Sequence, residues 1–490
     1  MGANVVLTVS FIFYSLAIIS IGLYSTKLRK KTTDDFVLAN RELGPWASSL
    51  SASASAESGW VMLGLVGAAF TNGLATFWIV PGIAVGYLFN WFVIAERIRK
   101  TTTASGAVTM PQFFCDRFGK KSSMIKIIPI IIITLAMLGY VAAQMNAAGK
   151  AFNAVFLLPY WMGVVIGAFI IMAYTVTGGF RAVCWTDIIQ AIFMVIALIG
   201  MPILVLIKLG GFSTILTQAR AIDPALLTAT AGKSGWTMFG FVVGFFGIGF
   251  GYPGQPHILA RFMAAKDKAT IRRGGIIAFV WFLLVYIGAI FFGLFAHVYF
   301  GNLADPEQAL PLACNHFLPP ILGGFVIAAI VAAISSTADS QLIVVSTIIS
   351  RDVFPFFKKE KLSNSNNPND IHHTDDFLQT QRLDRWVLVI LGIIAVFFAL
   401  TKNRIIFQFV LYAWSVLGAA FGPPVILGLL WKKANKTGAL AGMITGTVVS
   451  IVWRNIPLLK GYVYELIPAF VLSFLAVWIG SLLVTSSEND

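Results

Sequence analysis

Two hydrophobic segments of this chain are interrupted by residues that break helices or need hydrogen-bond partners. The first interruption covers residues 51–60, where serines alternate with alanines before an acid, and the second covers residues 249–257, which hold three glycines and two prolines. In membrane hydrocarbon, non-helical backbone persists only where it is buried in protein or lines a cavity. Two such interruptions in separate halves of a chain are typical of secondary transporters, which bind solute and ion there. We therefore expect transported solute and ion to complete these two interruptions.

The composition is that of a membrane protein. Of the 490 residues, 58% are hydrophobic and 11% are charged, whereas soluble domains carry about 25% charged residues. Since a spanning helix needs roughly 20 apolar residues, the sequence predicts an all-α integral membrane protein with about thirteen spans. The predicted spans cover residues 4–24, 44–70, 74–95, 125–148, 158–178, 187–208, 235–260, 274–298, 319–349, 385–401, 405–431, 437–455 and 463–484.

Basic residues are distributed unevenly between the two sides of these spans. If the N-terminus lies outside, the inward connections hold 27 of the 35 Lys and Arg residues, as the positive-inside tendency favours. The predicted orientation is therefore N-terminus out and C-terminus in. The net charge of +14 then reflects contact with anionic lipid rather than nucleic acid. Lys27 and Arg29 directly follow the first span, so we expect it to be a retained helix and not a cleaved signal peptide.

The spans divide into a repeated unit. Five spans within 44–208 begin with the first interruption, and five more within 235–431 begin with the second. Because five is odd, the second set enters the membrane in the opposite direction, which predicts a five-plus-five inverted repeat with a binding site at its interface. Residues 4–43 would form the first helix and an inner loop, and residues 432–490 two further helices and a short tail. We expect a single transmembrane transporter domain over 1–490.

Ionisable residues inside spans are unfavourable to bury and are usually functional. Three acids qualify: Glu57 in the first interruption, Asp187, and Asp339, which shares one helix face with Ser336 and Ser340. Hydroxyl and carbonyl oxygens are hard ligands that suit alkali cations. We therefore expect the cluster around Asp339 to bind a cation, although its hydroxyls could instead bond back to their own helix.

Two further alternatives remain open. Asp187 lies close to Arg181 in the sequence and could form a structural ion pair with it. The second interruption could be a simple proline kink, although a kink alone does not need three glycines. Tyr252 can present both a ring and a hydroxyl to a small solute, so we favour a binding role for this segment.

Several stretches spread over nearly the whole chain have distinctive residue patterns. They are Arg41-Glu42-Leu43-Gly44-Pro45, Ser58-Gly59-Trp60, Gly178-Gly179-Phe180, Trp185-Thr186-Asp187, Gly254-Gln255-Pro256-His257-Ile258-Leu259-Ala260-Arg261-Phe262-Met263-Ala264, Ser336-Thr337, Tyr412-Ala413-Trp414 and Gly418-Ala419-Ala420-Phe421-Gly422-Pro423. Together they resemble the sodium/solute symporter family, and most closely its sodium/proline branch. The resemblance implies the inverted-repeat fold of amino-acid/sodium symporters and alternating access driven by a sodium gradient.

The resemblance also implies which residues bind ion and solute. The family's usual sodium site takes main-chain carbonyls and hydroxyls, which correspond here to Ala54, Glu57, Ala333, Ser336 and Thr337. A second cation, which some relatives hold, would correspond to Ser336, Asp339, Ser340 and Asp187. The implied solute contacts are Ser58, Trp60, Tyr140, Gln144, Ile248, Tyr252, Gln255 and Pro256.

Several positions depart from the pattern of the family's proline symporters, among them Gln144 and Asn146, where those proteins have less polar residues. Ala56 stands where they carry an aspartate that is central to sodium use, and Glu57 supplies a carboxylate one residue later. A shift of one residue turns a side chain by about 100° on a helix. Ile248 stands where they carry a tryptophan. The expected coupling ion is sodium, and the alternative is a proton carried by Glu57, because burial disfavours a lone carboxylate charge.

We expect a cation-coupled secondary symporter that imports a small zwitterionic solute, proline or a related amino acid. A proton-coupled symporter and a transporter of a different small organic solute are the alternatives. The acids lie in separate motifs, so the sequence predicts no enzyme, and no obligatory protein partner is evident. The expected location is a cell membrane, either a bacterial inner membrane or a plasma membrane, with lipid, solute and sodium ion as partners and no nucleic acid.

Overall fold

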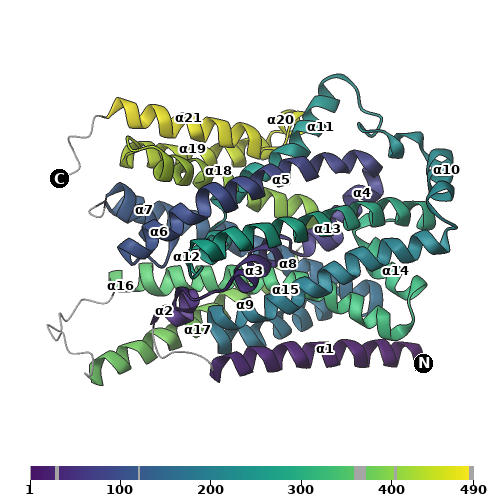
Figure 1. Cartoon of the computed structure of the whole chain (residues 1–490), viewed down its shortest axis with the longest axis horizontal. Coiled ribbons are helices and arrows are strands. Elements are labelled where there is room, and N and C mark those ends of the chain that lie inside the picture. Colours follow the sequence, from purple (N-terminus) through teal and green to yellow (C-terminus); the bar gives the residue numbers. More distant parts are fainter. Residues whose placement is uncertain (1, 28–32, 120–121, 358–370, 402–405, 485–490) are drawn as a thin grey trace.

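The computed structural model describes residues 2–27, 33–119, 122–357, 371–401 and 406–484, which form a bundle of helices (Figure 1). The long helices are α1 (Gly2–Lys27), α8 (Ser123–Phe156), α9 (Tyr160–Lys208), α13 (Lys268–Phe300), α15 (Pro320–Ile348), α17 (Ile371–Thr401), α18 (Ile406–Leu430), α19 (Lys436–Asn455) and α21 (Leu466–Leu483). The shorter helices are α2 (Thr33–Leu38), α3 (Pro45–Ala56), α4 (Val66–Asn72), α5 (Ile79–Phe89), α6 (Ala95–Ser105), α7 (Met110–Phe118), α10 (Phe212–Ile222), α11 (Gly235–Gly247), α12 (Pro256–Met263), α14 (Ala309–Phe317), α16 (Phe354–Phe357) and α20 (Pro457–Tyr462).

Both predicted interruptions are present. Helix α3 ends at Ala56 because Glu57 leaves the helical conformation, with φ −98° and ψ 62°. The chain resumes as a π-helical turn, η2 (Trp60–Leu65), before α4. In the second segment, α11 continues into a 3₁₀ stretch, η6 (Ile248–Gly254), and Gln255 is extended, with φ −92° and ψ 106°, before α12 starts. The glycines and prolines of this segment account for the break, since they disfavour or remove the helical hydrogen bonds.

The two interrupted segments cross the bundle in opposite directions. In Figure 1 the chain runs from left to right through α3 and α4 and from right to left through α11 and α12. Two main-chain hydrogen bonds join the beginning of the first segment to the end of the second: Leu43 N to Ala264 O at 3.1 Å and Lys266 N to Leu43 O at 3.0 Å. We call this pair of bonds the backbone clasp. Opposite directions are what an inverted repeat requires.

Eleven stretches of the described residues are long and apolar enough to cross a membrane. Two features explain why this number is lower than the predicted thirteen spans. Trp60–Ser105 is one continuous apolar stretch, although Gly73 turns the chain within it at φ +57°. Helix α9 is kinked at Gly179, with φ +65°, which leaves Tyr160–Val176 as a shorter apolar piece. The number of thirteen spans therefore remains a prediction.

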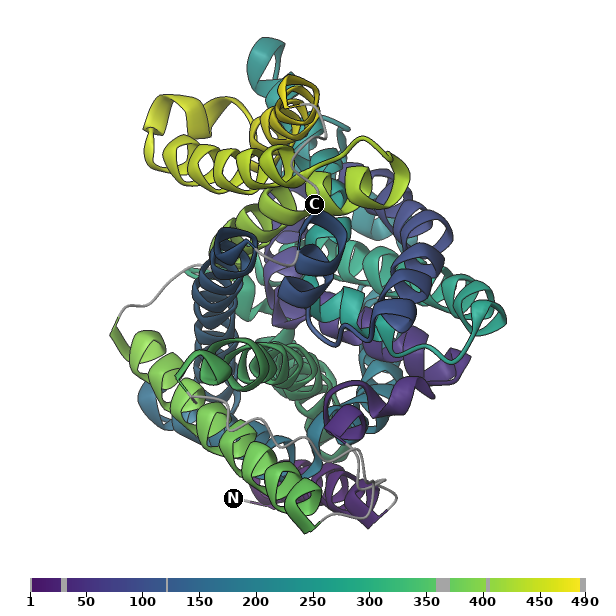
Figure 2. The same ribbon diagram turned by 90° about the vertical axis from the view of Figure 1, so that its left-hand side faces the viewer.

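Helix α15 lies in the interior of the bundle. In Figure 2, which looks along the helices, α15 (green) is central, α19 and α21 (yellow) lie at the upper edge, and α1 and α17 lie at the lower edge. Between Val326 and Thr347, every residue of α15 except Val344 is buried. The hydroxyl-rich part of α15 is therefore enclosed by other helices and faces no lipid.

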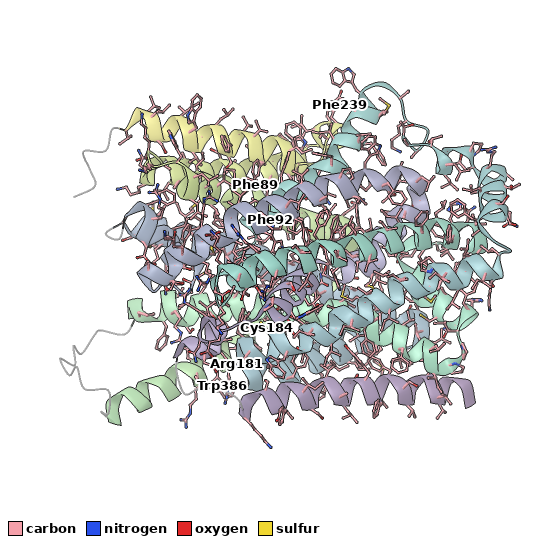
Figure 3. All side chains as sticks on the ribbon, in the orientation of Figure 1. Phe89, Phe92, Arg181, Cys184, Phe239 and Trp386 are labelled. Atoms are coloured by element: carbon pink, nitrogen blue, oxygen red, sulfur yellow. The ribbon has the colours of Figure 1, made fainter. Side chains whose placement is uncertain are left out.

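The outside of the bundle is apolar, as lipid contact requires. Side chains labelled in Figure 3 show this: Phe92 is 45% exposed, Phe239 53% and Trp386 68%. Exposed apolar patches of this extent are unusual on soluble monomers. This surface agrees with the membrane location predicted from the composition.

The first described helix starts, and the last one ends, on opposite sides of the bundle. The start of α1 lies at the right of Figure 1, and the end of α21 lies at the left, where α2, α6 and α7 also lie. We call this left end the basic end, because α6 and α7 carry Arg97, Arg99, Lys100 and Arg117 there, and Lys268 at the start of α13 pairs with Glu96 of α6. Termini on opposite sides agree with an odd number of crossings. The assignment of the basic end to the inside stays a prediction.

Cysteine labelling in intact cells tests that orientation. In a variant without Cys115, Cys184 and Cys314, Gln218→Cys on α10 should react with a membrane-impermeant maleimide added outside, because α10 lies opposite the basic end. Thr103→Cys on α6, equally exposed, should react only after the cells are permeabilised. The reverse labelling pattern would invert the predicted orientation.

Candidate functional site

The first interruption meets α15 at a cluster of oxygen atoms. Ser336 Oγ lies 2.9 Å from the carbonyl oxygen of Ala54 and 3.1 Å from that of Ala333. Thr337 Oγ1 lies 3.4 Å from the same Ala54 oxygen and donates to the carbonyl of Ser55 at 2.9 Å. Four of the five predicted sodium-site residues therefore lie together across α3 and α15. Such hard oxygen donors suit an alkali cation. Over the described ranges, no group of three or more His, Cys, Asp and Glu side chains could hold a metal ion.

Glu57, whose main-chain carbonyl is the fifth predicted sodium ligand, directs its side chain away from α15. Its carboxylate accepts hydrogen bonds from the hydroxyls of Tyr252 at 2.6 Å and Tyr87 at 3.0 Å on one oxygen, and from Tyr286 on the other. The carboxylate and all three rings are buried. We call Tyr87, Tyr252 and Tyr286 the tyrosine cage. Because these tyrosines lie on α5, η6 and α13, the carboxylate does not replace the missing aspartate beside α15.

Protein side chains satisfy part of the backbone opened by both interruptions. Gln144 on α8 accepts the amide of Gly59 at 3.1 Å and donates to Ser58 Oγ at 3.2 Å. Gln255 donates to the carbonyl of Gly251 at 3.2 Å and to a carbonyl of α18 at 3.1 Å. The expectation that cargo alone completes the two interruptions is therefore wrong in part. Gln144, Gln255 and Ser58, which are all predicted solute contacts, therefore form hydrogen bonds with main-chain groups at the two interruptions.

Aromatic rings surround the outer side of the first interruption. The ring of Trp60 packs against Tyr286 and Phe407, with centroids 6.0 and 5.9 Å away. Its Nε1 donates to the carbonyl of Ala56 at 3.2 Å, which spans the break in the helix. Trp60 is therefore held in place from both sides of the break.

A second group of aromatic rings lies at η6. The ring of Tyr252 stands edge-on to Trp414 of α18, with centroids 4.9 Å apart, and Trp414 Nε1 donates to the carbonyl of Ile248 at 3.0 Å. Deeper, Tyr140 of α8 lies edge-on to His257 of α12 at 6.4 Å, next to the predicted contact residue Pro256, at which α12 starts. The predicted solute residues of the two interruptions therefore lie on facing elements, α8, η2, η6 and α12.

The predicted second cation site holds an arginine. The guanidinium of Arg261 lies 3.4 Å from the carboxylate of Asp187, and it also donates to Ser340 Oγ. All three side chains are buried. A fixed positive charge thus lies where we expected a second ion, so the geometry does not favour a second sodium ion there. The alternative for Asp187, a structural ion pair, is present with a different partner, because Arg181 pairs instead with Asp35 at 2.5 Å.

Asp339 has a separate set of partners. Its carboxylate accepts the hydroxyl of Tyr174 at 2.7 Å and that of Ser340 at 3.3 Å. Ser340 Oγ also lies 2.6 Å from the carbonyl of Ser336 on its own helix. Back-bonding to the own helix therefore occurs at both Ser340 and Ser336, and both hydroxyls also contact α3, Ser336 at the carbonyl of Ala54 and Ser340 at Ser55 Oγ.

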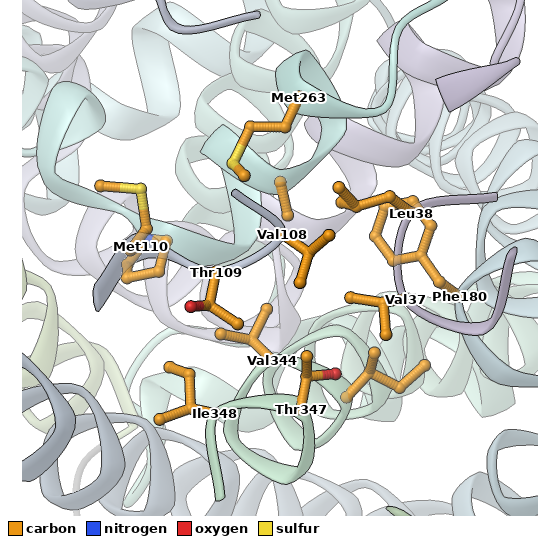
Figure 4. A pocket seen from close by; sticks show the side chains of 13 residues that line it. Val37, Leu38, Val108, Thr109, Met110, Phe180, Met263, Val344, Thr347 and Ile348 are labelled. Carbon is orange, nitrogen blue, oxygen red and sulfur yellow. The ribbon is translucent and has the colours of Figure 1, made fainter. Parts of the chain in front are cut away.

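Two cavities of unequal size lie near the interruptions. A cavity of about 490 Å³ lies between α11, α18 and α20, and Ile248, Phe245 and Phe407 contribute to its wall. At the basic end, a pocket of about 20 Å³ is lined mainly by apolar side chains, including Pro256 and Met263 (Figure 4). The larger cavity thus adjoins Phe407, whose ring packs against Trp60, and the smaller one adjoins the start of α12 at Pro256.

Sequence reasoning missed several residues of this site. Tyr87 and Tyr286 lie in long apolar spans, and nothing in their spacing marks them as partners of Glu57. Arg261 and Trp414, in contrast, lie inside two of the distinctive stretches. A basic residue next to a predicted span was the available signal for Arg261, and its burial was not foreseen.

The sequence comparisons with known proteins all find transporters. The family model described as "Sodium:solute symporter family" matches residues 36–446. The high-affinity proline transporter PutP of Bacillus subtilis is 36% identical over 482 residues, covering 96% of this chain and 98% of the relative. The osmoregulated proline transporter OpuE of the same organism is 34% identical over 481 residues, covering 96% and 94%.

Solved structures show the same fold. A sodium-coupled sialic acid symporter in a substrate-bound, outward-open state superposes with a TM-score of 0.81, at 20% identity and 99% coverage of both chains. The transporter MhsT, solved with L-phenylalanine, gives a TM-score of 0.58 at 14% identity, covering 90% of this chain and 98% of that one. At these identities the likeness shows the fold alone.

The buried pair of Arg261 and Asp187 should be required for stability. Arg261→Gln leaves a buried carboxylate without its cation, which typically costs about 3–5 kcal/mol, and adding Asp187→Asn should recover part of that loss. Thermal unfolding of the purified protein in detergent measures both effects. As a control, Lys268→Gln removes an exposed ion pair with Glu96 and should cost below about 1 kcal/mol. Equal losses for Arg261→Gln and Lys268→Gln would contradict the assignment.

Proposed function

The chain belongs to the sodium:solute symporter family, and on that premise we propose that it imports proline or a related amino acid together with sodium. It is a multi-pass membrane protein and a sodium-coupled solute symporter. The named relatives are transporters, and two of them are proline transporters by name. The observation that carries the proposal is the cluster in which Ser336 and Thr337 of α15 contact the carbonyl of Ala54 at the broken end of α3.

In this proposal the sodium ion binds between α3 and α15. Its ligands are the carbonyl oxygens of Ala54, Glu57 and Ala333 and the hydroxyls of Ser336 and Thr337. The hydroxyls now donate to the carbonyls of Ala54, Ala333 and Ser55, and they would turn their lone pairs to a bound cation instead. No carboxylate belongs to this set. The site therefore attracts the ion less strongly than a site with an anionic ligand would, since opposite charges attract strongly where the surroundings are poor in water.

The solute is proposed to bind beside Trp60 and Tyr252. These aromatic side chains suit the apolar body of proline, and the open backbone at the two interruptions offers donors and acceptors for its charged ends. Ile248 and Phe407 reach from this region into the cavity of about 490 Å³. That cavity supports entry of the solute from the end opposite the basic end.

The transport cycle follows from this arrangement. Sodium bound between α3 and α15 would order the first interruption and thereby fix Trp60. Solute bound against both interruptions would then allow the two repeats, 44–208 and 235–431, to close over it together. Release toward the basic end would pass the small pocket beside Pro256, which must widen. The inward potential adds about 2.3 kcal/mol per charge per 100 mV to the driving force for sodium.

Uptake of radiolabelled proline into proteoliposomes tests the proposed solute. With an inward sodium gradient, proline should accumulate above its external concentration, and accumulation should collapse when sodium is equal on both sides and the potential is clamped. Competition by other unlabelled amino acids ranks the solute preference. If sodium drives no proline accumulation but does drive uptake of another amino acid, the transported solute is that amino acid and not proline.

Removing either hydroxyl of the sodium cluster should weaken sodium use. Ser336→Ala and Thr337→Ala each remove one ligand, and a loss of about 1–2 kcal/mol corresponds to a sodium requirement raised roughly 5–30-fold. The measurement is the sodium concentration that gives half-maximal uptake. Ser346→Ala is the matched control, because Ser346 lies on the same helix and, among the residues that the structure describes, its hydroxyl bonds only the carbonyl of Ile343 at 3.0 Å. An unchanged sodium requirement in both Ser336→Ala and Thr337→Ala would contradict the proposed sodium site.

A further inference from the structure

Four exposed cationic side chains lie around a single acid where α6 meets the start of α13, at the basic end. Lys268 of α13 pairs with Glu96 of α6 at 2.5 Å, which joins the two helices there. Arg97 and Arg272 lie within electrostatic range of the same carboxylate, and Lys100 follows Glu96 by one helical turn on the same face of α6. We call Arg97, Lys100, Lys268 and Arg272 the basic patch. Each of the four is exposed.

One acid leaves most of this positive charge uncompensated. Among the residues that the structure describes, Lys268 is the only member of the basic patch that forms an ion pair. The next acid along the chain, Asp267, accepts the amide of Thr270 at 2.7 Å and thereby caps α13. Like charges on neighbouring helices repel each other, so an anion that bridges the helices is stabilising. The basic patch therefore favours a negatively charged ligand.

An apolar surface continues from the basic patch along both helices. On one side, Phe92 is 45% exposed and lies in η4 (Asn90–Ile94), between α5 and α6 (Figure 3). On the other side, Ile276 of α13 is 61% exposed. The two sides touch, because a Cβ atom at Gly275 would lie only 3.1 Å from the ring of Phe92. Cations next to a lipid-facing apolar surface match a phospholipid, whose phosphate and acyl chains are joined in the same order.

Arg99 connects the basic patch to the backbone clasp. It lies on α6, donates from Nε to the carbonyl of Ala265 at 2.7 Å, and also donates to the carbonyl of Lys266. Lys266 belongs to the clasp, since its amide donates to the carbonyl of Leu43. Holding α6 against the start of α13 therefore also supports the clasp. An anion that draws these two helices together would stabilise the closed form of the basic end.

We propose that the phosphate of an anionic phospholipid binds between Arg97 and Lys100 of α6 and Arg272 of α13, and that this lipid keeps the basic end closed. Its acyl chains would lie along Phe92 and Ile276. Arginine suits this role because its planar fork matches two phosphate oxygens. A zwitterionic lipid binds less well, because its own cation meets the same side chains and reduces the attraction. In the predicted orientation the basic patch meets the cytoplasmic leaflet, whose surface is negative.

Lipid binding to the delipidated full-length protein in neutral detergent tests the site. Native mass spectrometry measures the binding of phosphatidylglycerol and of phosphatidylcholine with identical acyl chains. Phosphatidylglycerol should bind at least about fivefold more tightly, which is the contribution of one cation near an anionic surface. Equal affinity for the two lipids would overturn the inference. Glycerol phosphate at the same concentration should displace no lipid, and displacement by it would overturn the assignment of the site to a lipid.

Removing charge from the basic patch should abolish this lipid preference. Arg97→Gln/Arg272→Gln removes two cations and should weaken phosphatidylglycerol binding about 25-fold, or fivefold for each cation. Arg97→Lys/Arg272→Lys keeps both charges and should retain most of the preference. Lys432→Gln/Lys433→Gln is the matched control, because these exposed lysines lie between α18 and α19, in a turn that contacts α7 at the same end. An unchanged preference in Arg97→Gln/Arg272→Gln, or an equal loss in the control, would overturn the inference.

Cysteine labelling measures whether the lipid closes the basic end. In a variant without the three native cysteines, Ala260→Cys reports on the small pocket at the basic end, whose wall includes Ala260 of α12. In nanodiscs, a maleimide should react with this cysteine several-fold more slowly when phosphatidylglycerol is present than in phosphatidylcholine alone. Arg97→Gln/Arg272→Gln should remove that difference. Equal reaction rates in the two lipids would overturn the proposed closing role.

Discussion

The structure depends on satisfying backbone hydrogen bonds where water is absent. Two helices are broken inside the bundle, and each break exposes amides and carbonyls that cannot be left unpaired in a membrane interior. One glutamine side chain forms hydrogen bonds with the exposed backbone at each break, Gln144 at the first and Gln255 at the second. Trp60 and Trp414 add a side-chain donor at the same places. These partners let the breaks persist before any solute binds, so the binding region is formed in advance.

The absence of water also requires partners for the buried charges. Arg261 neutralises Asp187 directly, and near the opposite end Lys150 bonds both Glu307 at 2.7 Å and Asp305 at 2.9 Å. Glu307 also accepts the amides of Ile406 and Phe407, which fixes the start of α18. Glu57 differs because only neutral hydroxyls surround it.

Much of the fold could be predicted from the sequence because its signals are local. Glycine, proline and the serine–alanine run located both interruptions, and the motif around Ser336 and Thr337 located the oxygen cluster. The number of spans was harder, since single glycines at 73 and 179 turn or kink apolar stretches that composition alone reads as uniform.

The side-chain directions could not be predicted. The backbone angles of Glu57 decide that it faces α5 and α13 rather than α15, and no pattern encodes those angles. The partners of Asp187 posed the same difficulty, because a nearby arginine in sequence, Arg181, was the natural candidate. The arginine that meets Asp187, Arg261, is 74 residues away. Packing between the repeats brings these two together, and a single sequence carries little information about such distant contacts.

The backbone clasp has a consequence for how the protein can vary. It ties Leu43 to the turn after α12 through amide and carbonyl groups, and the side chains of Leu43, Ala264 and Ala265 are buried beside it. Variation of the sequence at the clasp is therefore expected at the exposed Lys266 rather than at the three buried residues. Because the clasp joins the beginning of the first interrupted segment to the end of the second, these two ends cannot separate without breaking both hydrogen bonds.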